Sequence, residues 1–286
     1  MKSLLLATDL SSRSERALLR AASLVRQFDC PWFILHVVDS DQPQLRVELE
    51  VEQIRRDLEA RLGEFTERAG RAPEIWVEAG DPAPRIAECA RWGDIDLLVM
   101  GVHRRNALRD VFVGTTMERA VRTCEKPVLV VNGEPESSYR DLVLALDLSP
   151  TSARAARVAK ALGLMDGARC RAVHAFEPFA KVMLMNAGIA TPALDDHLTG
   201  EERNARLNLM AFLDEQGLLA QVGEQRVEEG LPMTVLRRVM ADSPPDLLVL
   251  GTRGMGGIKR VLIGSVADAA LREFECDILA VPPGRD

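Results

Sequence analysis

Residues 5–11 of the chain read Leu-Leu-Ala-Thr-Asp-Leu-Ser, and residues 143–149 read Val-Leu-Ala-Leu-Asp-Leu-Ser. Each stretch places a run of apolar residues directly before an aspartate and a serine, which is typical of a buried strand that ends in a polar turn. The two copies lie 138 residues apart in a chain of 286 residues. The sequence therefore predicts a duplicated unit whose first strand ends at Asp9 in one copy and at Asp147 in the other.

Further matches follow in the same order along both halves. His36 and His174 keep the offset of 138, whereas residues 96–101 (Asp-Leu-Leu-Val-Met-Gly) and 246–251 (Asp-Leu-Leu-Val-Leu-Gly) lie 150 residues apart. The second half thus carries about twelve extra residues after His174.

The polar, turn-prone residues 132–139 separate the two copies. We therefore expect a first domain over residues 1–135 and a second over residues 138–286, each long enough to bury a core of its own. Residues 128–131 and 278–281 are apolar strands near the ends of the two halves, and they would leave open sheet edges if unpaired.

Apolar runs alternate with helical patterns in each half, which is typical of βαβ units. We predict an α/β fold of two tandem domains, each a five-stranded parallel sheet of order 3-2-1-4-5 flanked by helices. A single helix is expected over residues 45–70, where apolar residues recur every three or four positions. The strands are expected at about residues 3–8, 31–38, 74–79, 95–100 and 127–131, and again at about 141–146, 169–176, 223–228, 246–250 and 277–281.

The composition, 47% hydrophobic and 28% charged, is that of an ordinary globular protein. A net charge of −7 argues against a basic face for nucleic acid. No apolar run approaches the roughly 20 residues of a membrane-spanning helix, and the segment after Met1 has too short an apolar core for a signal peptide. We expect a cytoplasmic protein without a membrane span or a nucleic-acid partner.

The cysteines and histidines form no recognisable reactive pattern. The five cysteines are never spaced as CxxC, and no histidine has partners at metal-ligand spacing. His36 and His174 end equivalent strands, which favours a role in the fold. We therefore expect buried thiols, and we assign no metal ligand and no catalytic residue.

The loop after the fourth strand of the second half is rich in glycine. It runs Gly-Thr-Arg-Gly-Met-Gly-Gly-Ile-Lys-Arg-Val-Leu-Ile-Gly-Ser over residues 251–265. Glycines let a backbone approach a phosphate, and a helix that begins at Ser265 would present free N–H groups to an anion. Neither a P-loop nor GxGxxG is present. A Gly-rich connection before an ordinary helix therefore remains an alternative.

This loop resembles the ATP-binding pattern of universal stress proteins. Gly251, Gly254, Gly264 and Ser265 match Gly-x-x-Gly, nine residues, then Gly-Ser. The likeness covers essentially the whole chain in two copies, as in the tandem two-domain members. Domains of this family commonly pair through their last strands, so the resemblance implies that residues 128–131 and 278–281 pair or pack between the halves. It implies an ATP-binding protein of the stress response that acts as a regulator or binding module.

The resemblance also implies roles for individual residues. The ligand would be ATP, with ADP or AMP as alternatives and Mg²⁺ accompanying ATP. Asp147 and the backbone of Ala175 would meet the adenine, although Asp147 could instead cap the following helix. Ribose and phosphates would be met by the loop and the helix start, at Gly251, Arg253, Gly254, Gly264, Ser265 and Val266.

The first half departs from the pattern. Arg104 stands where the second glycine belongs, while Gly114 keeps the far end and Asp9 and Val37 stay in the adenine positions. An arginine could contact phosphate, but it would also crowd the space that the backbone needs. We therefore expect one nucleotide per chain, held in the second domain.

Two other functions stay open. The chain could be a scaffold for a non-nucleotide ligand or a partner, using the apolar insertion at residues 178–194. It could also be an ATPase. Its turnover would then be slow, because the sequence offers no base or water-positioning group for the terminal phosphate. An unidentified protein partner and a homodimer are further expectations of the binding-module hypothesis.

Overall fold

The computed structural model describes residues 1–11, 14–102, 116–133, 138–177, 193–253 and 263–284, without the side chains of residues 193–199. The strands of the first half are β1 (Leu4–Ala7), β2 (Trp32–Asp39), β3 (Glu74–Gly80), β4 (Leu97–Gly101) and β5 (Val128–Val131). Those of the second half are β6 (Asp141–Ala145), β7 (Arg169–Phe176), β8 (Val222–Glu229), β9 (Leu247–Gly251) and β10 (Asp277–Val281). Each of the ten predicted strands is present.

The helices that connect these strands also follow the two-copy plan. They are α1 (Ser14–Phe28), α2 (Gln44–Ala60), α3 (Leu62–Ala69), α4 (Pro82–Trp92), α5 (Thr116–Thr123), α6 (Pro150–Ala161), α8 (Ala193–Glu215), α9 (Pro232–Asp242) and α10 (Ser265–Glu273). The prediction of one helix over residues 45–70 is wrong. The backbone of Arg61 leaves helical geometry at φ −96° and ψ 3°, and its N–H bonds to the carbonyl of Leu58. The apolar periodicity continues across Arg61, so the sequence pattern could not reveal the break in the helix.

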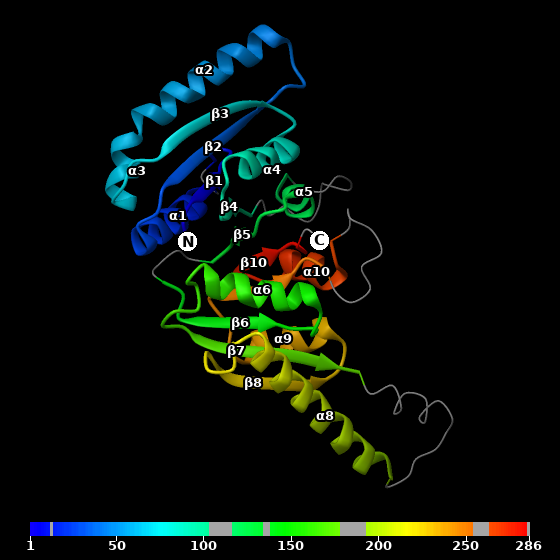
Figure 1. Cartoon of the computed structure of the whole chain (residues 1–286). Helices are drawn as coiled ribbons and strands as arrows, with labels where there is room; N and C mark the ends of the chain where they lie inside the picture. The colour runs from blue at the N-terminus through cyan, green and yellow to red at the C-terminus, as the bar shows by residue number, and fades with distance from the viewer. Residues whose placement is uncertain (12–13, 103–115, 134–137, 178–192, 254–262, 285–286) are drawn as a thin grey trace.

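The strands form one continuous ten-stranded sheet in the order β3-β2-β1-β4-β5-β10-β9-β6-β7-β8 (Figure 1). Each half keeps the predicted order 3-2-1-4-5, with parallel neighbours. The halves meet where β5 pairs antiparallel with β10, with Val130 opposite Ile278. The expected pairing of residues 128–131 with residues 278–281 is therefore confirmed, and it closes the edge that each half would otherwise expose.

Helices cover both faces of this sheet. On β1, Leu4 and Leu6 face the core beneath α1, α2, α3, α6 and α8, whereas Leu5 and Ala7 face the core beneath α4, α5, α9 and α10. Side chains alternate between the faces of a strand, so a strand covered on both faces must be apolar at every position. All four of these residues are at most 5% exposed, which explains the uninterrupted apolar runs in the sequence.

A buried carboxylate joins the two halves beside this central pair of strands. Asp277, the first residue of β10, is fully buried. Its Oδ1 accepts hydrogen bonds from the backbone N–H groups of Asn132 and Gly133, both at 2.9 Å. Its Oδ2 accepts from Arg20 Nε at 2.9 Å and from the Tyr139 hydroxyl at 2.7 Å. One side chain of the second half therefore binds α1, the end of β5 and the connection that follows.

The partners of Asp277 are themselves enclosed. Arg20 and Tyr139 are each 4% exposed, and the Arg20 guanidinium carbon lies 4.4 Å from the centre of the Tyr139 ring. Burial and the neighbouring Asp277 carboxylate raise the pKa of the Tyr139 hydroxyl well above its usual value, so it remains a donor. We call Asp277, its two side-chain donors Arg20 and Tyr139, and the backbone N–H groups of Asn132 and Gly133 the seam network.

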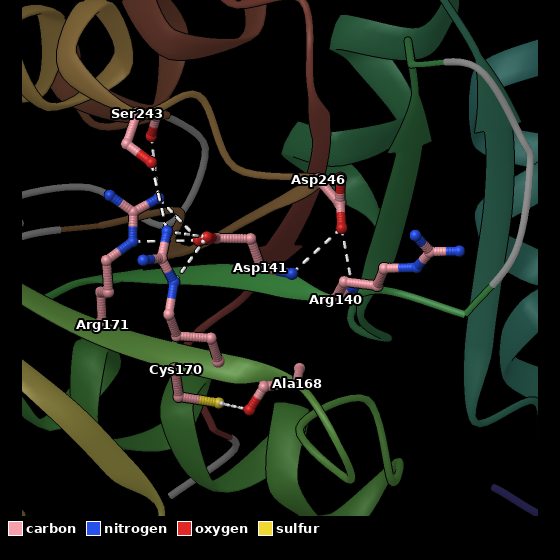
Figure 2. Close-up of polar contacts among 8 residues, drawn as sticks. Arg140, Asp141, Ala168, Cys170, Arg171, Ser243 and Asp246 are labelled. Carbon is pink, nitrogen blue, oxygen red and sulfur yellow. Dashed lines mark hydrogen bonds and ion pairs between the residues drawn. The ribbon is translucent and has the colours of Figure 1, made fainter.

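A second charged cluster lies at the amino ends of β6 and β7 (Figure 2). Arg171, 2% exposed, donates to Asp141 Oδ1 at 2.6 Å and to the carbonyl of Ser243 at 2.8 Å. Arg169 Nε donates to Asp141 Oδ2 at 2.8 Å, and Asp246 accepts from the backbone of Asp141 at 3.0 Å. The cluster fastens the segment between α9 and β9 to the sheet, at the edge opposite the strand ends singled out by the sequence.

The seam network predicts a large effect of a nearly isosteric change. Asp277→Asn replaces the carboxylate that accepts from Arg20 Nε at 2.9 Å with a neutral amide, in a place where both side chains are buried. We expect a loss of about 3–5 kcal/mol in the free energy of unfolding, measured by urea titration.

A matched control is Glu52→Gln, because Glu52 also accepts from an arginine at 3.0 Å but is exposed in α2. Its urea midpoint should hardly move, since exposed ion pairs contribute little. Equal midpoints for Asp277→Asn and wild type would show that the network does not hold the halves together.

Candidate functional site

The strand ends predicted to bind the ligand meet at one edge of the second half. β6 pairs with β7 on one side and with β9 on the other, all parallel. Asp147, Ala175 and Gly251 therefore come together from the carboxyl ends of three neighbouring strands. The chain leaves β6 and β9 in opposite directions across the sheet, which is where open parallel sheets bind ligands.

The turn after β6 fixes the Asp147 carboxylate. Leu148 adopts φ +60°, which is unusual for a residue with a side chain, and the N–H of Ser149 donates to Asp147 Oδ1 at 3.0 Å. Ser149 Oγ accepts from the N–H of Ser152 at 3.2 Å and so caps α6. Ser149 therefore caps α6, and Asp147 does not, which was the alternative role for Asp147. The sequence motif does not include Ser149.

His174 holds the end of β7 against β6. Its Nδ1 donates to the carbonyl of Leu146 at 2.8 Å, and His36 makes the equivalent bond to Thr8 at 3.0 Å in the first half. Both histidines thus act in the fold, as the sequence predicts, and each places the next residue of its strand at the edge of the sheet. In the second half that residue is Ala175.

Gly251 is a glycine because α6 lies against it. A Cβ on Gly251 would stand 2.8 Å from Thr151 Cγ2 and 3.2 Å from the Thr151 carbonyl carbon. Real side chains do not pack at such distances, and part of the obstruction is backbone. Absence of a side chain here lets the first turn of α6 and the end of β9 approach each other, which keeps Asp147 and Gly251 at one site.

The start of α10 is held by a residue that the motif does not include. Gly264 precedes the helix, and its N–H donates to the carbonyl of Thr252 at 2.8 Å. Because this N–H is already bonded within the protein, it does not face a phosphate as the resemblance implies. The next two N–H groups, of Ser265 and Val266, belong to the first turn, where a helix has no carbonyl to bond them. The first intrahelical bond of α10 runs from the N–H of Asp268 to the carbonyl of Gly264, so the N–H groups of Ser265 and Val266 precede it.

Part of the predicted loop lies outside the described residues. Gly254 and the rest of residues 254–262 belong to that part, as do Arg104 in the first half and residues 178–192 of the apolar insertion. Arg253 is half-buried just before it.

The first half has a cavity at the equivalent place, with a volume of about 380 Å³. Most of its lining is apolar, and polar groups come from the ends of β1 and β2 and from the starts of α1 and α5. The lining residues are Ala7, Thr8, Asp9, Ser14, Leu35, His36, Val37, Pro82, Ile86, Met100, Gly101, Val102, Thr116 and Met117. The sequence motif places Asp9 and Val37 at this edge of the sheet, but it does not reveal the cavity that they line.

Two titratable groups of this cavity have shifted pKa values. Burial by itself would raise the pKa of Asp9, but hydrogen bonds from Ser14 and Ser11 to its Oδ1 outweigh that effect and lower it. Burial lowers the pKa of His36, against the smaller effect of its bond to the Thr8 carbonyl. Asp9 is therefore ionised and His36 neutral near pH 7. The lowered pKa of Asp9 has a signal in the sequence, namely the serines two and five residues after this strand-end aspartate.

The thiols give the site no reactive group. All five cysteines are free; Cys276 is half-buried and the others are buried. Burial raises the pKa of Cys89, Cys124 and Cys170 to about 11, and that of Cys276 to about 12. Such groups stay protonated and are poor nucleophiles at neutral pH.

The described residues contain neither a metal-binding cluster nor a helix suited to cross a membrane. Within that part of the chain, no group of three or more His, Cys, Asp or Glu side chains is placed to hold a metal ion. Among the described helices, none combines the length and the apolar character that a membrane crossing demands.

Comparison with known proteins identifies relatives over both halves. The chain is 32% identical over 146 residues to a universal stress protein of Thermus aquaticus, covering 50% of this chain and 98% of that protein. It is 23% identical over 198 residues to universal stress protein E of Escherichia coli K12, covering 67% of this chain and 62% of that protein. The match to the latter therefore spans less than two thirds of its length.

The fold as a whole also has solved counterparts. A universal stress protein from Archaeoglobus fulgidus covers 99% of this chain and 98% of its own, with a TM-score of 0.71 at 17% identity. A putative universal stress protein from Pseudomonas aeruginosa covers 99% of this chain and 94% of its own, with a TM-score of 0.63 at 18% identity.

The family model of universal stress proteins matches residues 1–132 and again residues 138–282. These two matches together take in nearly the whole chain, in the order and at the spacing of the internal repeat. The chain belongs to the universal stress protein family.

Proposed function

We propose that this protein binds an adenine nucleotide at the carboxyl edge of its second domain and acts in the stress response as a regulator or binding module. The observation that carries the proposal is the convergence of three features on one edge: the strand-end carboxylate of Asp147, the side-chain-free approach at Gly251, and the start of α10 at Ser265. ATP is the expected ligand, with ADP or AMP as alternatives and Mg²⁺ accompanying ATP.

Each feature has a role that its chemistry allows. The Asp147 carboxylate, positioned by Ser149, accepts hydrogen bonds from donors of the adenine end, next to the Ala175 backbone. The N–H groups of Ser265 and Val266, the positive end of α10 and the Ser265 hydroxyl stabilise phosphate charge. Thr252 fixes where α10 begins by accepting from Gly264. By the family motif, Arg253 and Gly254 are assigned to the ribose and the phosphates.

Binding without rapid turnover fits this arrangement best. Hydrolysis needs a group that activates or positions water at the terminal phosphate. In this assignment the site's carboxylate, Asp147, lies at the adenine end, away from the phosphate end at Ser265. We therefore propose a cytoplasmic nucleotide-binding module with at most slow ATP hydrolysis, whose output passes to an unidentified protein partner.

The anion site predicts graded effects of two substitutions. Ser265→Ala should weaken ATP binding about two- to tenfold, because it removes one hydroxyl hydrogen bond and keeps the N–H groups. Gly254→Val should weaken it more, since a β-branched side chain fills space that the backbone and phosphates share. Both are measured by calorimetric titration of the full chain.

Thr115→Ala is the matched control, because Thr115 holds the position of Ser265 in the first half. It should leave ATP affinity unchanged. Equal ATP binding by wild type and Gly254→Val would remove the loop from the site.

Assignment to the second domain predicts the stoichiometry. Native mass spectrometry of the full chain with excess ATP should show one nucleotide per chain, and Asp147→Asn should lower its occupancy while Asp9→Asn does not. The physical reason is that Arg104 occupies the place of a phosphate-loop glycine in the first half. Two nucleotides per chain, or loss of binding with Asp9→Asn, would show that the first half also binds ATP.

A further inference from the structure

The first-half cavity is a site separate from the proposed nucleotide site. Because β5 and β10 run antiparallel, the carboxyl ends of the two halves point in opposite directions along the strands at the seam. The cavity lies between the ends of β1, β2 and β4 and the starts of α4 and α5. A ligand held in it therefore cannot also contact Ser265 of the second half. Its volume of about 380 Å³ lies in the range of small-molecule sites.

The walls of the cavity are apolar and adaptable. Leu35, Ile86, Met100 and Met117 are all buried, and each lines the space. The second half has Leu250 and Ala267 at the positions of the two methionines. Methionine side chains are flexible and polarisable and adapt to flat ring systems. These walls suit a compact apolar body, preferably an aromatic one.

The charge of the described lining is negative. Asp9 is its one formally charged side chain, because His36 is neutral and the remaining described lining residues do not ionise. Ser11 and Ser14 donate to Asp9 Oδ1. Among the described residues, the hydrogen bonds to the Asp9 carboxylate all go to Oδ1, so Oδ2 is the acceptor assigned to a ligand. Asp9 is exposed at the rim, so a ligand reaches it without opening the core.

Helix starts around the cavity do not reverse this sign. The start of α1 faces Asp9, the N-cap of α4 is Asp81, and the first turn of α5 holds Glu118. Each of these helix starts has a carboxylate beside it, and two of the three carboxylates also pair with an arginine, Asp81 with Arg119 and Glu118 with Arg272. In the second half the N-cap of α9 is Leu231, so the corresponding helix start lacks one. The starts of α6 and α10 keep a carboxylate, Asp147 and Asp268, so the two halves differ in this respect only at Asp81 and Leu231.

We propose that the first-half cavity binds a small organic cation, an aromatic or similarly compact apolar body bearing a protonated amine. The apolar body lies against Leu35, Met100 and Met117, and the amine donates to the Asp9 carboxylate. This site goes beyond the proposed nucleotide function and does not depend on it, because the two ligands occupy opposite edges of the sheet.

A pair of probes with the same body and opposite charge tests the proposal. Tryptamine and indoleacetate are titrated separately into the full chain and followed by ligand-observed NMR. Tryptamine should bind about tenfold or more tightly than indoleacetate, because its ammonium meets the Asp9 carboxylate whereas the acid is repelled by it. Equal affinities, tighter binding of indoleacetate, or no binding of tryptamine would overturn the proposal.

Matched variants locate the bound amine. Asp9→Asn should lower tryptamine affinity to that of indoleacetate, and Asp147→Asn, at the same position of the second half, should leave tryptamine binding intact. Val37→Phe fills the cavity and should abolish binding, whereas Ala175→Phe, its counterpart, should not. Loss of tryptamine binding in the second-half variants alone would place it elsewhere and overturn the assignment.

The nucleotide proposal is tested independently in the same samples. ATP binding should survive Asp9→Asn and Val37→Phe and should not be displaced by tryptamine. If ATP fails to bind but tryptamine binds at Asp9, only the nucleotide proposal fails. If ATP binds in the second half and tryptamine does not bind, only the amine proposal fails.

Discussion

The arrangement of the whole chain depends on one buried carboxylate. Asp277 begins β10 with four hydrogen-bond donors around it, and those donors come from α1, from the end of β5 and from the connection between the halves. A charge enclosed in this way is costly unless it is fully paired, so an alternative packing of the halves would have to satisfy both Asp277 and Arg20 elsewhere. The seam network thus acts together with the antiparallel β5–β10 pair. Two five-stranded units become one sheet, and their ligand-binding edges point in opposite directions.

The duplicated plan leaves room for the two sites to differ. Both copies keep the strand-end aspartate, the following leucine at φ +60° and the histidine that bonds back to the first strand. Backbone strain retained twice at the same turn is a feature often found at functional sites. The differences lie around this common frame, in the side chains that line each site and in the carboxylate at Asp81 where the other copy has Leu231. A gene duplication that fixes the frame can therefore yield two ligand preferences in one chain.

Local pattern was enough to predict the ten strands, whereas the pairing at the seam was expected from the resemblance to the family together with the apolar strand edges. Strands buried on both faces are apolar at every position, so they stand out in the sequence. The strands that contain Val128 and Ile278 would each leave an open edge, and pairing them with each other closes both edges. The break at Arg61 was missed because the apolar spacing runs through it. The seam network was not predicted because Arg20, Tyr139 and Asp277 are far apart in sequence, and a lone aspartate at the start of a strand carries no sign of burial.

At the candidate site, the sequence motif located the right edge but not its internal bonds. The Gly264 N–H is taken by Thr252, a residue with no place in the motif, and Ser149 caps the helix that Asp147 could have capped. Such bonds depend on how three loops meet, which spacing along the chain does not encode. The reason for Gly251 is likewise visible only in space, because it is the approach of Thr151 that excludes a side chain.

The central claim is that the nucleotide lies in the second domain, between Asp147 and the start of α10. A crystal structure of the full chain grown with ATP tests it most directly. The account predicts adenine beside Asp147 and Ala175, phosphates at the N–H groups of Ser265 and Val266, and no nucleotide in the first-half cavity. Nucleotide density in the cavity beside Asp9, with none at Ser265, would contradict it.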